Sequence, residues 1–324
     1  MASLAFLLTV AVLCSAATAS RTAATANCSR ASVGLTPLVD LSSGSYQGFR
    51  GGLYPGGRNA PSTVYLKKGM AYVKLVKPRA ADGRLSTSGR VVLLSIGMSN
   101  TTQEFSEFKR MADAGTRKSP SVIVVDGAQG GQDAERTKDP SAPFWSNIDR
   151  RLEADGVTSR QVQVAWVKQA IARPTEAFPA DAKRLQTNMR AIVQIMRQRY
   201  PNLRLVYLSS RTYGGYATTQ LNPEPYAYQS GFAVKWLVQE RIEGKLKGPW
   251  LAWGPYLWTD GTKGRRDGLT WTCEDVREDG THPSASGRQK VAAQLVRFFE
   301  TSPTARPWFS RGSLSSAAAA VSTG

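Results

Sequence analysis

Histidine and cysteine are scarce in this sequence of 324 residues, which contains one histidine, His282, and three cysteines. A zinc site needs about four nitrogen, sulfur or oxygen ligands gathered in one place. One imidazole and a few thiols far apart in the chain do not supply that set, so we expect no metal ion. The glycine-rich patterns that bind dinucleotides or nucleoside triphosphates are missing as well, so we expect no nucleotide binding.

Apolar stretches long enough to form a membrane helix are missing beyond residue 20. The first 19 residues contain an apolar run at 4–13, followed by Ala17-Thr18-Ala19, but no basic residue. The run is too short to span a bilayer, and an A-x-A pattern is typical of a signal-peptide cleavage site. We therefore predict a signal peptide over residues 1–19 and a secreted or periplasmic protein without stable membrane insertion. A buried N-terminal helix is the alternative.

Removal of this segment would leave two cysteines, Cys28 and Cys273. In an oxidising compartment two cysteines can form a disulfide. Such a bond would tie the start of the mature chain to the segment before His282. Two unpaired thiols are the alternative, and the sequence does not decide between them.

Acidic residues are few, because 24 Asp and Glu stand against 42 Lys and Arg, which gives a net charge of +18. Such a surface attracts anionic partners, among them acidic polysaccharide, an anionic membrane surface and nucleic acid. The sequence contains no zinc-finger or RNP-type motif, and its basic residues are scattered rather than clustered. We expect a solvated basic exterior, with anionic polysaccharide as one partner that the charge favours, and no nucleic-acid partner.

Residues 20–88 are expected to form an N-terminal extension of loops and short strands. Ser, Thr, Gly, Asn and Pro are frequent in residues 20–60, and residues 63–78 alternate well enough for two short strands around Lys68-Gly69. At the other end, residues 303–324 include the low-complexity run SLSSAAAAVSTG and are predicted to be disordered.

Between these segments, residues 89–302 alternate between strand and helix patterns. Short continuous apolar runs are typical of parallel strands buried on both faces. They occur at 91–96, 121–126, 162–167 and 203–208, with a further candidate at 250–256. Helical patterns lie between them, and a last one follows at 284–299. This order predicts a doubly wound α/β fold with a mainly parallel sheet of about five strands, whose working site lies beyond the carboxyl ends of the strands.

Polar and small residues follow three of the predicted strands. Ser99 follows the first strand, in the turn GMSN. The pair Gly130 and Gly131 follows the second, and Lys168 and Gln169 follow the third. A hydroxyl at a strand-to-helix turn, glycine amides and side-chain donors at one sheet edge can together stabilise an anionic intermediate. Each also has an ordinary interpretation, as a helix-capping serine, a flexible loop, and a surface Lys and Gln.

The single histidine, His282, lies in DGTHPS, three residues after Asp279 and just before the last predicted helix. In a tight turn Asp279 can accept a hydrogen bond from Nδ1 of His282, which leaves Nε2 free to act as a base. A lone histidine is more often structural than catalytic, but a carboxylate three residues earlier in a polar loop favours catalysis.

The blocks GMSN, DGAQGG and DGTHPS together resemble those of the SGNH hydrolase superfamily, also called GDSL-type esterases, over residues 90–300. GMSN is nearer to the G-Q-S-N variant of carbohydrate acetylesterases than to G-D-S-L. The resemblance implies a three-layer α/β/α, flavodoxin-like fold and a serine esterase without a cofactor, and the predicted signal peptide adds that the esterase is exported. Ser99 would attack the ester, His282 would be the base, and Asp279 would orient His282.

The same resemblance implies that the substrate is an acylated carbohydrate or another small ester, and that the acyl group is small, with acetyl the first expectation. A non-catalytic carbohydrate-binding or cell-surface protein that retains the SGNH fold is the alternative.

The third block of the family, G-x-N-D, is replaced here by WVKQ. In the family its Asn donates to the oxyanion. Lys168 takes that place by spacing, whereas Gln169 is chemically closer to Asn. The resemblance therefore implies an oxyanion hole built from the Ser99 amide, the amide of Gly130 or Gly131, and the side chain of Lys168 or Gln169.

Residues 209–231 follow the fourth predicted strand at the same edge and carry Arg211, Tyr213 and Tyr216. Aromatic rings and hydrogen-bond donors here could hold a sugar, and Arg211 could hold a carboxylate. The alternative is a long structural loop whose tyrosines pack inside the protein.

Overall fold

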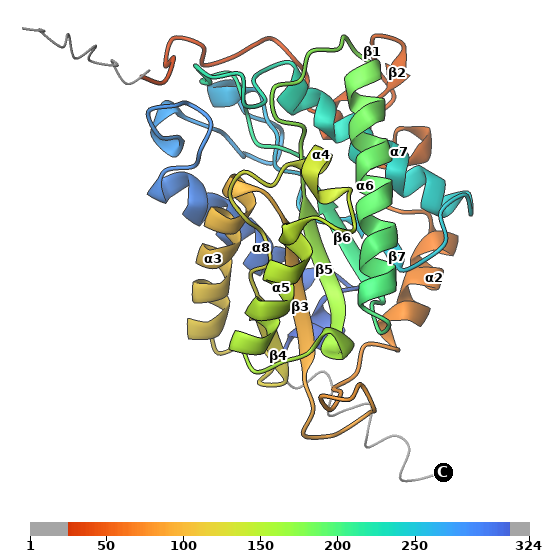
Figure 1. The fold of residues 1–324 in the computed structure, drawn as a ribbon. Coiled ribbons are helices and arrows are strands. Elements are labelled where there is room, and N and C mark those ends of the chain that lie inside the picture. The colour runs from red at the N-terminus through yellow and green to blue at the C-terminus, as the bar shows by residue number, and fades with distance from the viewer. Residues whose placement is uncertain (1–24, 312–324) are drawn as a thin grey trace, which may run out of the picture.

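The computed structural model describes residues 25–311 (Figure 1). Its centre is a five-stranded sheet in the order β4-β3-β5-β6-β7, in which all neighbouring strands are parallel. The strands are β3 (Val91–Gly97), β4 (Val122–Val125), β5 (Val162–Lys168), β6 (Leu205–Ser209) and β7 (Trp250–Trp253). Four of them are buried along their whole length, which explains why their sequences are mainly apolar. The predicted parallel sheet is confirmed.

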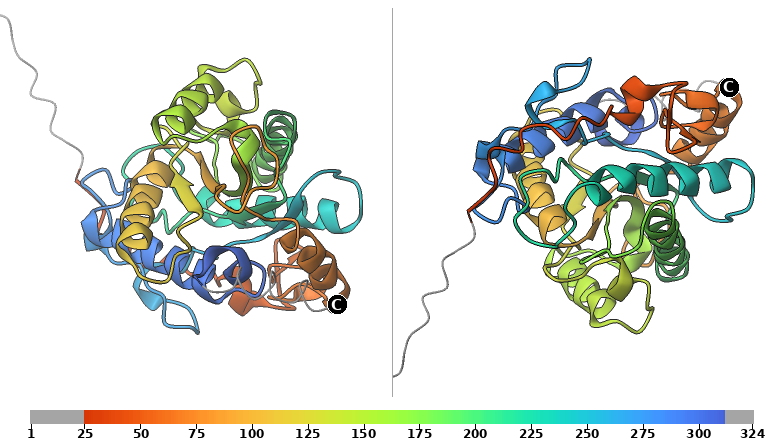
Figure 2. Two further views of the ribbon diagram at one scale, coloured as in Figure 1. Left: turned by 90° about the horizontal axis from the view of Figure 1, so that it is seen from below. Right: turned by 90° about the horizontal axis from the view of Figure 1, so that it is seen from above.

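Helices cover both faces of the sheet, so the predicted three-layer α/β/α fold is confirmed as well (Figure 2). On one face α3 (Ser99–Ala114) packs against α8 (Ala285–Thr301). On the other lie α5 (Pro143–Ala154) and α6 (Ala180–Arg199), and α6 packs against α7 (Tyr226–Ile242). In the part of the chain that the structure describes, no helix combines the length and apolar composition that a membrane crossing requires.

The strand order fixes where a site can form. The chain passes from β3 to β4 on one side and then returns to β5 on the other side of β3. This is the flavodoxin-like order, and the connections above the carboxyl ends diverge at this point and leave a crevice between them. The segments after β3, β4 and β5 all border that crevice.

The N-terminal segment packs against the sheet domain. It contains α1 (Leu38–Leu41), α2 (Thr63–Val73) and a small antiparallel hairpin of β1 (Ser45–Tyr46) and β2 (Phe49–Arg50). A disulfide joins Cys28 to Cys273, so the paired alternative holds. The first described residues run across the C-terminal part of the chain, shown in red and blue in Figure 2.

The prediction of two short strands within residues 63–78 is wrong, because helix α2 occupies residues 63–73. The Ser62 hydroxyl caps it by accepting a hydrogen bond from the Tyr65 N–H (3.2 Å). Tyr65, Gly69 and Val73 recur at every fourth position and are buried, which is helical spacing. Gly69 permits close packing on β7, since a Cβ there would lie 2.5 Å from the Trp250 ring.

The predicted disordered tail begins too early at residue 303. Residues 303–311 include α9 (Arg306–Phe309), whose Trp308 and Phe309 are buried and contact the ring of Phe299. Burial of these aromatic side chains explains why the segment is ordered. The remainder of the predicted tail and the predicted signal peptide at 1–19 lie outside the described residues.

Candidate active site

Ser99 stands at the carboxyl end of β3 as the first residue of α3. Gly97 makes the turn possible, because a Cβ there would lie 2.4 Å from both the main-chain oxygen of Lys168 and the hydroxyl of Thr101. As the first helical residue, Ser99 presents an N–H group that has no partner within the helix, and a helix N-terminus favours negative charge. Its hydroxyl therefore lies beside a group that can bind an anion.

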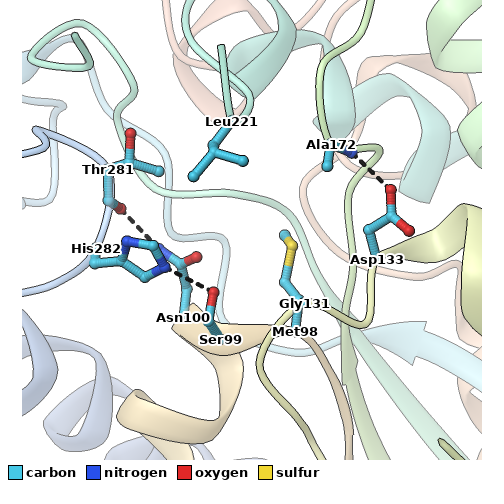
Figure 3. Close-up of a pocket in the computed structure, with 9 residues that line it drawn as sticks. All are labelled: Met98, Ser99, Asn100, Gly131, Asp133, Ala172, Leu221, Thr281 and His282. Carbon is cyan, nitrogen blue, oxygen red and sulfur yellow. Dashed lines mark hydrogen bonds between the residues drawn. The ribbon is translucent and has the colours of Figure 1, made fainter. Parts of the chain in front are cut away.

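Ser99, His282 and Asp279 form a continuous hydrogen-bonded relay. Ser99 Oγ lies 2.8 Å from His282 Nε2 (Figure 3). On the other side of the ring, His282 Nδ1 lies 2.5 Å from Asp279 Oδ2. With the ring proton on Nδ1, the serine hydroxyl donates to Nε2, which is the arrangement of a nucleophile, a base and an orienting carboxylate.

The carboxylate of Asp279 is held in its ionised form. Burial alone would raise its pKa, but hydrogen bonds from the His282 ring and from the main-chain N–H groups of His282 (2.9 Å) and Thr281 (3.0 Å) outweigh burial. Together they lower the pKa of Asp279 to about 2. At neutral pH the carboxylate is therefore charged and can stabilise an imidazolium.

Gly280 explains why the turn DGTH closes so tightly. Its φ is +62°, and a Cβ there would lie 1.8 Å from the main-chain oxygen of Tyr216. The next residue, Thr281, accepts a hydrogen bond from the side chain of Asn100 over 2.7 Å through its main-chain oxygen. The loop that carries His282 is thus bonded to the residue after Ser99 and packs closely against the loop after β6.

A small pocket of about 60 Å³ opens in front of the Ser99 hydroxyl. Ser99 and His282 line one side of it, and Leu221 projects into it from the opposite loop (Figure 3). Its apolar walls are side chains of modest size. The lining residues are Met98, Ser99, Asn100, Gly131, Asp133, Ala172, Leu221, Thr281 and His282.

The second block contributes Gly131 to the pocket, with φ +70°, whereas Gly130 is adjacent in sequence but not part of the lining. Asp133 follows as the N-cap of α4 (Ala134–Thr137) and accepts a hydrogen bond from the Arg136 N–H. Its other oxygen accepts one from the Ala172 N–H over 2.9 Å. This carboxylate therefore holds the loops after β4 and β5 together at the pocket wall.

The prediction that Lys168 or Gln169 supplies an oxyanion donor is wrong. Lys168 Nζ is fully buried and lies 2.6 Å from both carboxylate oxygens of Glu104 in α3. Gln169 donates to the main-chain oxygen of Gln132 and to the Thr137 hydroxyl. Burial lowers the pKa of Lys168 to about 8, although the charge of Glu104 opposes this. Both side chains are therefore bonded to other residues, and neither lines the pocket.

The predicted substrate-binding side chains of Arg211, Tyr213 and Tyr216 do not line the pocket either. All three are at most 3 % exposed. Tyr213 donates to the main-chain oxygen of Arg30, and Tyr216 donates to that of Trp271. The two rings pack edge to face, so the alternative of tyrosines packed inside a structural loop holds. A substrate in the pocket of Ser99 would not touch these side chains.

No protein-family model matches the chain, and no curated protein matches it significantly. Among solved structures it is similar to a carbohydrate esterase of family 3 from Talaromyces cellulolyticus, at 14% identity over 63% of this chain and 94% of that one, with a TM-score of 0.40. The same four values describe its similarity to an acetyl esterase mutant with acetate ion. It is also similar to the periplasmic domain of a lipopolysaccharide acetyltransferase from Salmonella ser. Paratyphi A, at 12% identity over 74% of this chain and 97% of that one, with a TM-score of 0.38.

At such identities and TM-scores these likenesses carry no argument about activity. The strand order and the placement of GMSN and DGTHPS at one sheet edge agree with the resemblance to SGNH hydrolases.

Several pocket residues were not predicted from the sequence. Leu221 and Ala172 come from loops whose course depends on the whole fold, and no local pattern marks them. Asp133 had a local signal, since Asp before a short helical stretch is a typical N-cap. The sequence would have identified the cap but not its second contact, with Ala172.

Proposed function

We propose that this protein is a serine esterase that removes small acyl groups, with acetyl the preferred one, by an acyl-enzyme mechanism. The observation that carries the proposal is the relay from the Ser99 hydroxyl through His282 to Asp279, with contacts of 2.8 and 2.5 Å. The relay stands at the carboxyl edge of a parallel sheet, beside an open pocket.

In the proposed mechanism, Ser99 Oγ attacks the ester carbonyl while His282 Nε2 takes its proton. The negative charge that develops on the carbonyl oxygen is stabilised by main-chain N–H groups of Ser99 and Gly131. His282 then gives the proton to the leaving alcohol. Water hydrolyses the acyl-enzyme through the same base, and Asp279 stabilises the imidazolium in both halves of the reaction.

The size of the pocket supports a small acyl group. Its volume of about 60 Å³ is well below the roughly 300 Å³ at which pockets for drug-sized ligands begin. The apolar side chains of Met98 and Leu221 suit a methyl group. A long acyl chain would need those side chains to move.

We propose that a carbohydrate carries the ester, because GMSN is similar to the acetylesterase block. Export is proposed with it, and the Cys28–Cys273 disulfide supports an oxidising compartment. The net charge of +18 supports an anionic polysaccharide as the carrier of the acyl groups.

One observation favours a second candidate, a non-catalytic carbohydrate-binding protein with this fold. Lys168 and Gln169, at the place of the family's oxyanion Asn, are both engaged elsewhere. Loss of one oxyanion donor typically costs about 3–4 kcal/mol of transition-state stabilisation, which weakens an esterase without abolishing it. Labelling of Ser99 distinguishes the two candidates.

The test follows hydrolysis of p-nitrophenyl acetate by the chain from Ser20 onward and by its Ser99→Ala and His282→Ala variants. Circular dichroism first establishes that all three fold. We expect both variants to lose roughly a thousandfold or more in kcat, and a fluorophosphonate probe to label the wild type but not Ser99→Ala. A folded wild type that neither turns over nor takes the label would favour the binding protein.

A further inference from the structure

Two asparagines of this chain, Asn27 and Asn100, each begin the pattern Asn-x-Ser/Thr, in which x is not proline. The segments are Asn-Cys-Ser at 27–29 and Asn-Thr-Thr at 100–102. In exported proteins this pattern marks asparagines that receive a glycan on Nδ2, and a group of that size needs an accessible surface loop. The structure therefore decides which of the two asparagines is suited to be a site.

Asn100 is not suited to carry a glycan. Its side chain is 2% exposed, and its Nδ2 donates to the main-chain oxygen of Thr281 over 2.7 Å. A glycan is attached through that same nitrogen, so it would have to break this hydrogen bond and find room inside the protein. A chain modified at Asn100 could therefore not adopt this fold.

Asn27 lies in an exposed turn whose backbone is well held. Its main-chain oxygen accepts a hydrogen bond from the Arg30 N–H over 3.2 Å, which closes the turn. Its own N–H donates to the main-chain oxygen of Tyr216 over 2.9 Å, which ties the turn to the loop after β6. Asn27 and Ser29 are both exposed to solvent. This turn can therefore carry a bulky group without any movement of the backbone.

The two side chains that define the pattern already contact each other. Ser29 Oγ donates to Asn27 Oδ1 over 2.6 Å, so the bond occupies the carbonyl oxygen of the Asn27 amide. Within residues 25–311, the Nδ2 of Asn27 takes part in no hydrogen bond. Attachment of a sugar to this nitrogen would therefore break no contact of the folded protein, in contrast to Asn100.

The middle residue of the pattern, Cys28, forms the disulfide with Cys273. This bond does not prevent modification of Asn27, because its second cysteine is synthesised 245 residues later. At the usual rate of chain synthesis that delay is roughly 10–50 s. Asn27 thus enters an exporting compartment while Cys28 is still unpaired, and the disulfide can close after the glycan has been attached to the neighbouring residue.

We propose that Asn27 is the acceptor of an asparagine-linked glycan in the exported protein. The donor is an oligosaccharide linked to a lipid through a diphosphate. Nδ2 of Asn27 attacks C1 of the first sugar, the bond from C1 to the diphosphate oxygen breaks, and a C1–Nδ2 bond forms. The lipid diphosphate leaves, and the amide nitrogen loses one proton. Of the proposed function, this inference uses only the proposed export. Asn27 does not line the pocket of Ser99.

The experiment sends the chain from Ser20 onward into the secretory pathway of a eukaryotic cell behind that cell's own leader, so that entry does not depend on residues 1–19. Peptide N-glycosidase then releases asparagine-linked glycans and converts the asparagine that carried them to aspartate. Mass spectrometry of the intact chain and of its peptides locates the change. We expect one glycan per chain, attached at position 27, and an unmodified Asn100.

Substitutions in the turn test the assignment. We expect Asn27→Gln and Ser29→Ala to abolish the glycan, and Ser29→Thr to keep it because the hydroxyl remains. Asn59→Gln is the matched control, since Asn59 is also an exposed asparagine near the N-terminus but is followed by Ala-Pro and lies outside the pattern. This variant should carry the same glycan as the wild type.

Secreted chains and chains retained in the cell are measured in the same way, so poor secretion of a variant does not obscure the result. A wild type with an unmodified Asn27, made in cells whose own secreted glycoproteins carry glycans, would overturn the inference. A glycan that persists in both Asn27→Gln and Ser29→Ala would overturn it as well. Because the readout is a mass and not a rate, the result is independent of whether the protein hydrolyses an ester.

Discussion

The side-chain amide of Asn100 donates a hydrogen bond to the main-chain oxygen of Thr281 over 2.7 Å. Asn100 follows the proposed nucleophile, and Thr281 precedes the proposed base. Both are buried, at 2% and 7% exposure, and both line the pocket. This one bond therefore fixes the first turn of α3 against the loop of His282 and sets the separation of the two reacting groups.

We expect Asn100→Ala to lower kcat about tenfold with little change in KM. The substitution leaves a buried main-chain oxygen without its donor, at a cost of about 1–3 kcal/mol, and releases the loop of His282. Steady-state kinetics with p-nitrophenyl acetate measure the effect. Asn188→Ala is the control, because Asn188 is also buried but donates to Glu135 in α4. A raised KM with unchanged kcat would instead make Asn100 a substrate contact.

The sheet could be predicted from the sequence because its signal is local. Strands buried on both faces are mainly apolar, and β3, β5 and β6 carry only one or two polar residues each. Helix α2 was missed because its burial depends on a distant strand. Its Gly69 faces Trp250 of β7, which lies far away in the sequence. Tail residues Trp308 and Phe309 are ordered for the same reason, through contact with Phe299.

In the candidate site, too, the residues with a local sequence signal could be predicted, and those whose position depends on distant contacts could not. Ser99 and the pair Asp279 and His282 lie in short blocks whose geometry is set by a single turn, so their residues could be named in advance. The direction of the Lys168 side chain could not be predicted from the sequence, because its partner Glu104 lies on another element and the two side chains are buried together. The sequence shows that a lysine ends the strand, but it does not show whether the fold places a carboxylate within ion-pair distance of that lysine.

The stability of the protein should fall in acid partly through Asp279. Its pKa is about 2 in the folded protein and ordinarily 3.8, so its stabilising contribution is complete above about pH 4 and is lost as the pH falls toward 2. Since the group is partly exposed, solvent screening reduces the contribution to about 1 kcal/mol. Urea unfolding of wild type and Asp279→Asn at a series of pH values measures it. The two curves should differ at pH 5 and converge near pH 2, and a constant difference would exclude this origin.

Removal of the disulfide should destabilise the whole fold. Cys28 and Cys273 are 245 residues apart, so the bond restricts the unfolded chain strongly. We expect the double substitution Cys28→Ala and Cys273→Ala to lower the free energy of unfolding by about 2–4 kcal/mol. Urea denaturation measures the loss, and treatment of the wild type with reductant should reproduce it. An unchanged midpoint in reductant, together with two titratable thiols in the native protein, would show that the bond is not formed.

Leu221 should set the length of the acyl group. It projects into the pocket of about 60 Å³ opposite Ser99 and is partly exposed, so shortening it enlarges the pocket without opening the core. One methylene in an apolar pocket is worth about 1–3 kcal/mol of discrimination. We therefore expect Leu221→Ala to raise the ratio of kcat/KM for p-nitrophenyl butyrate over acetate at least about tenfold. Leu41→Ala is the control, because Leu41 is also part-buried but lies in α1. Equal ratios in both variants would place the acyl group elsewhere, whereas a change confined to Leu221→Ala ties acyl length to this wall of the pocket.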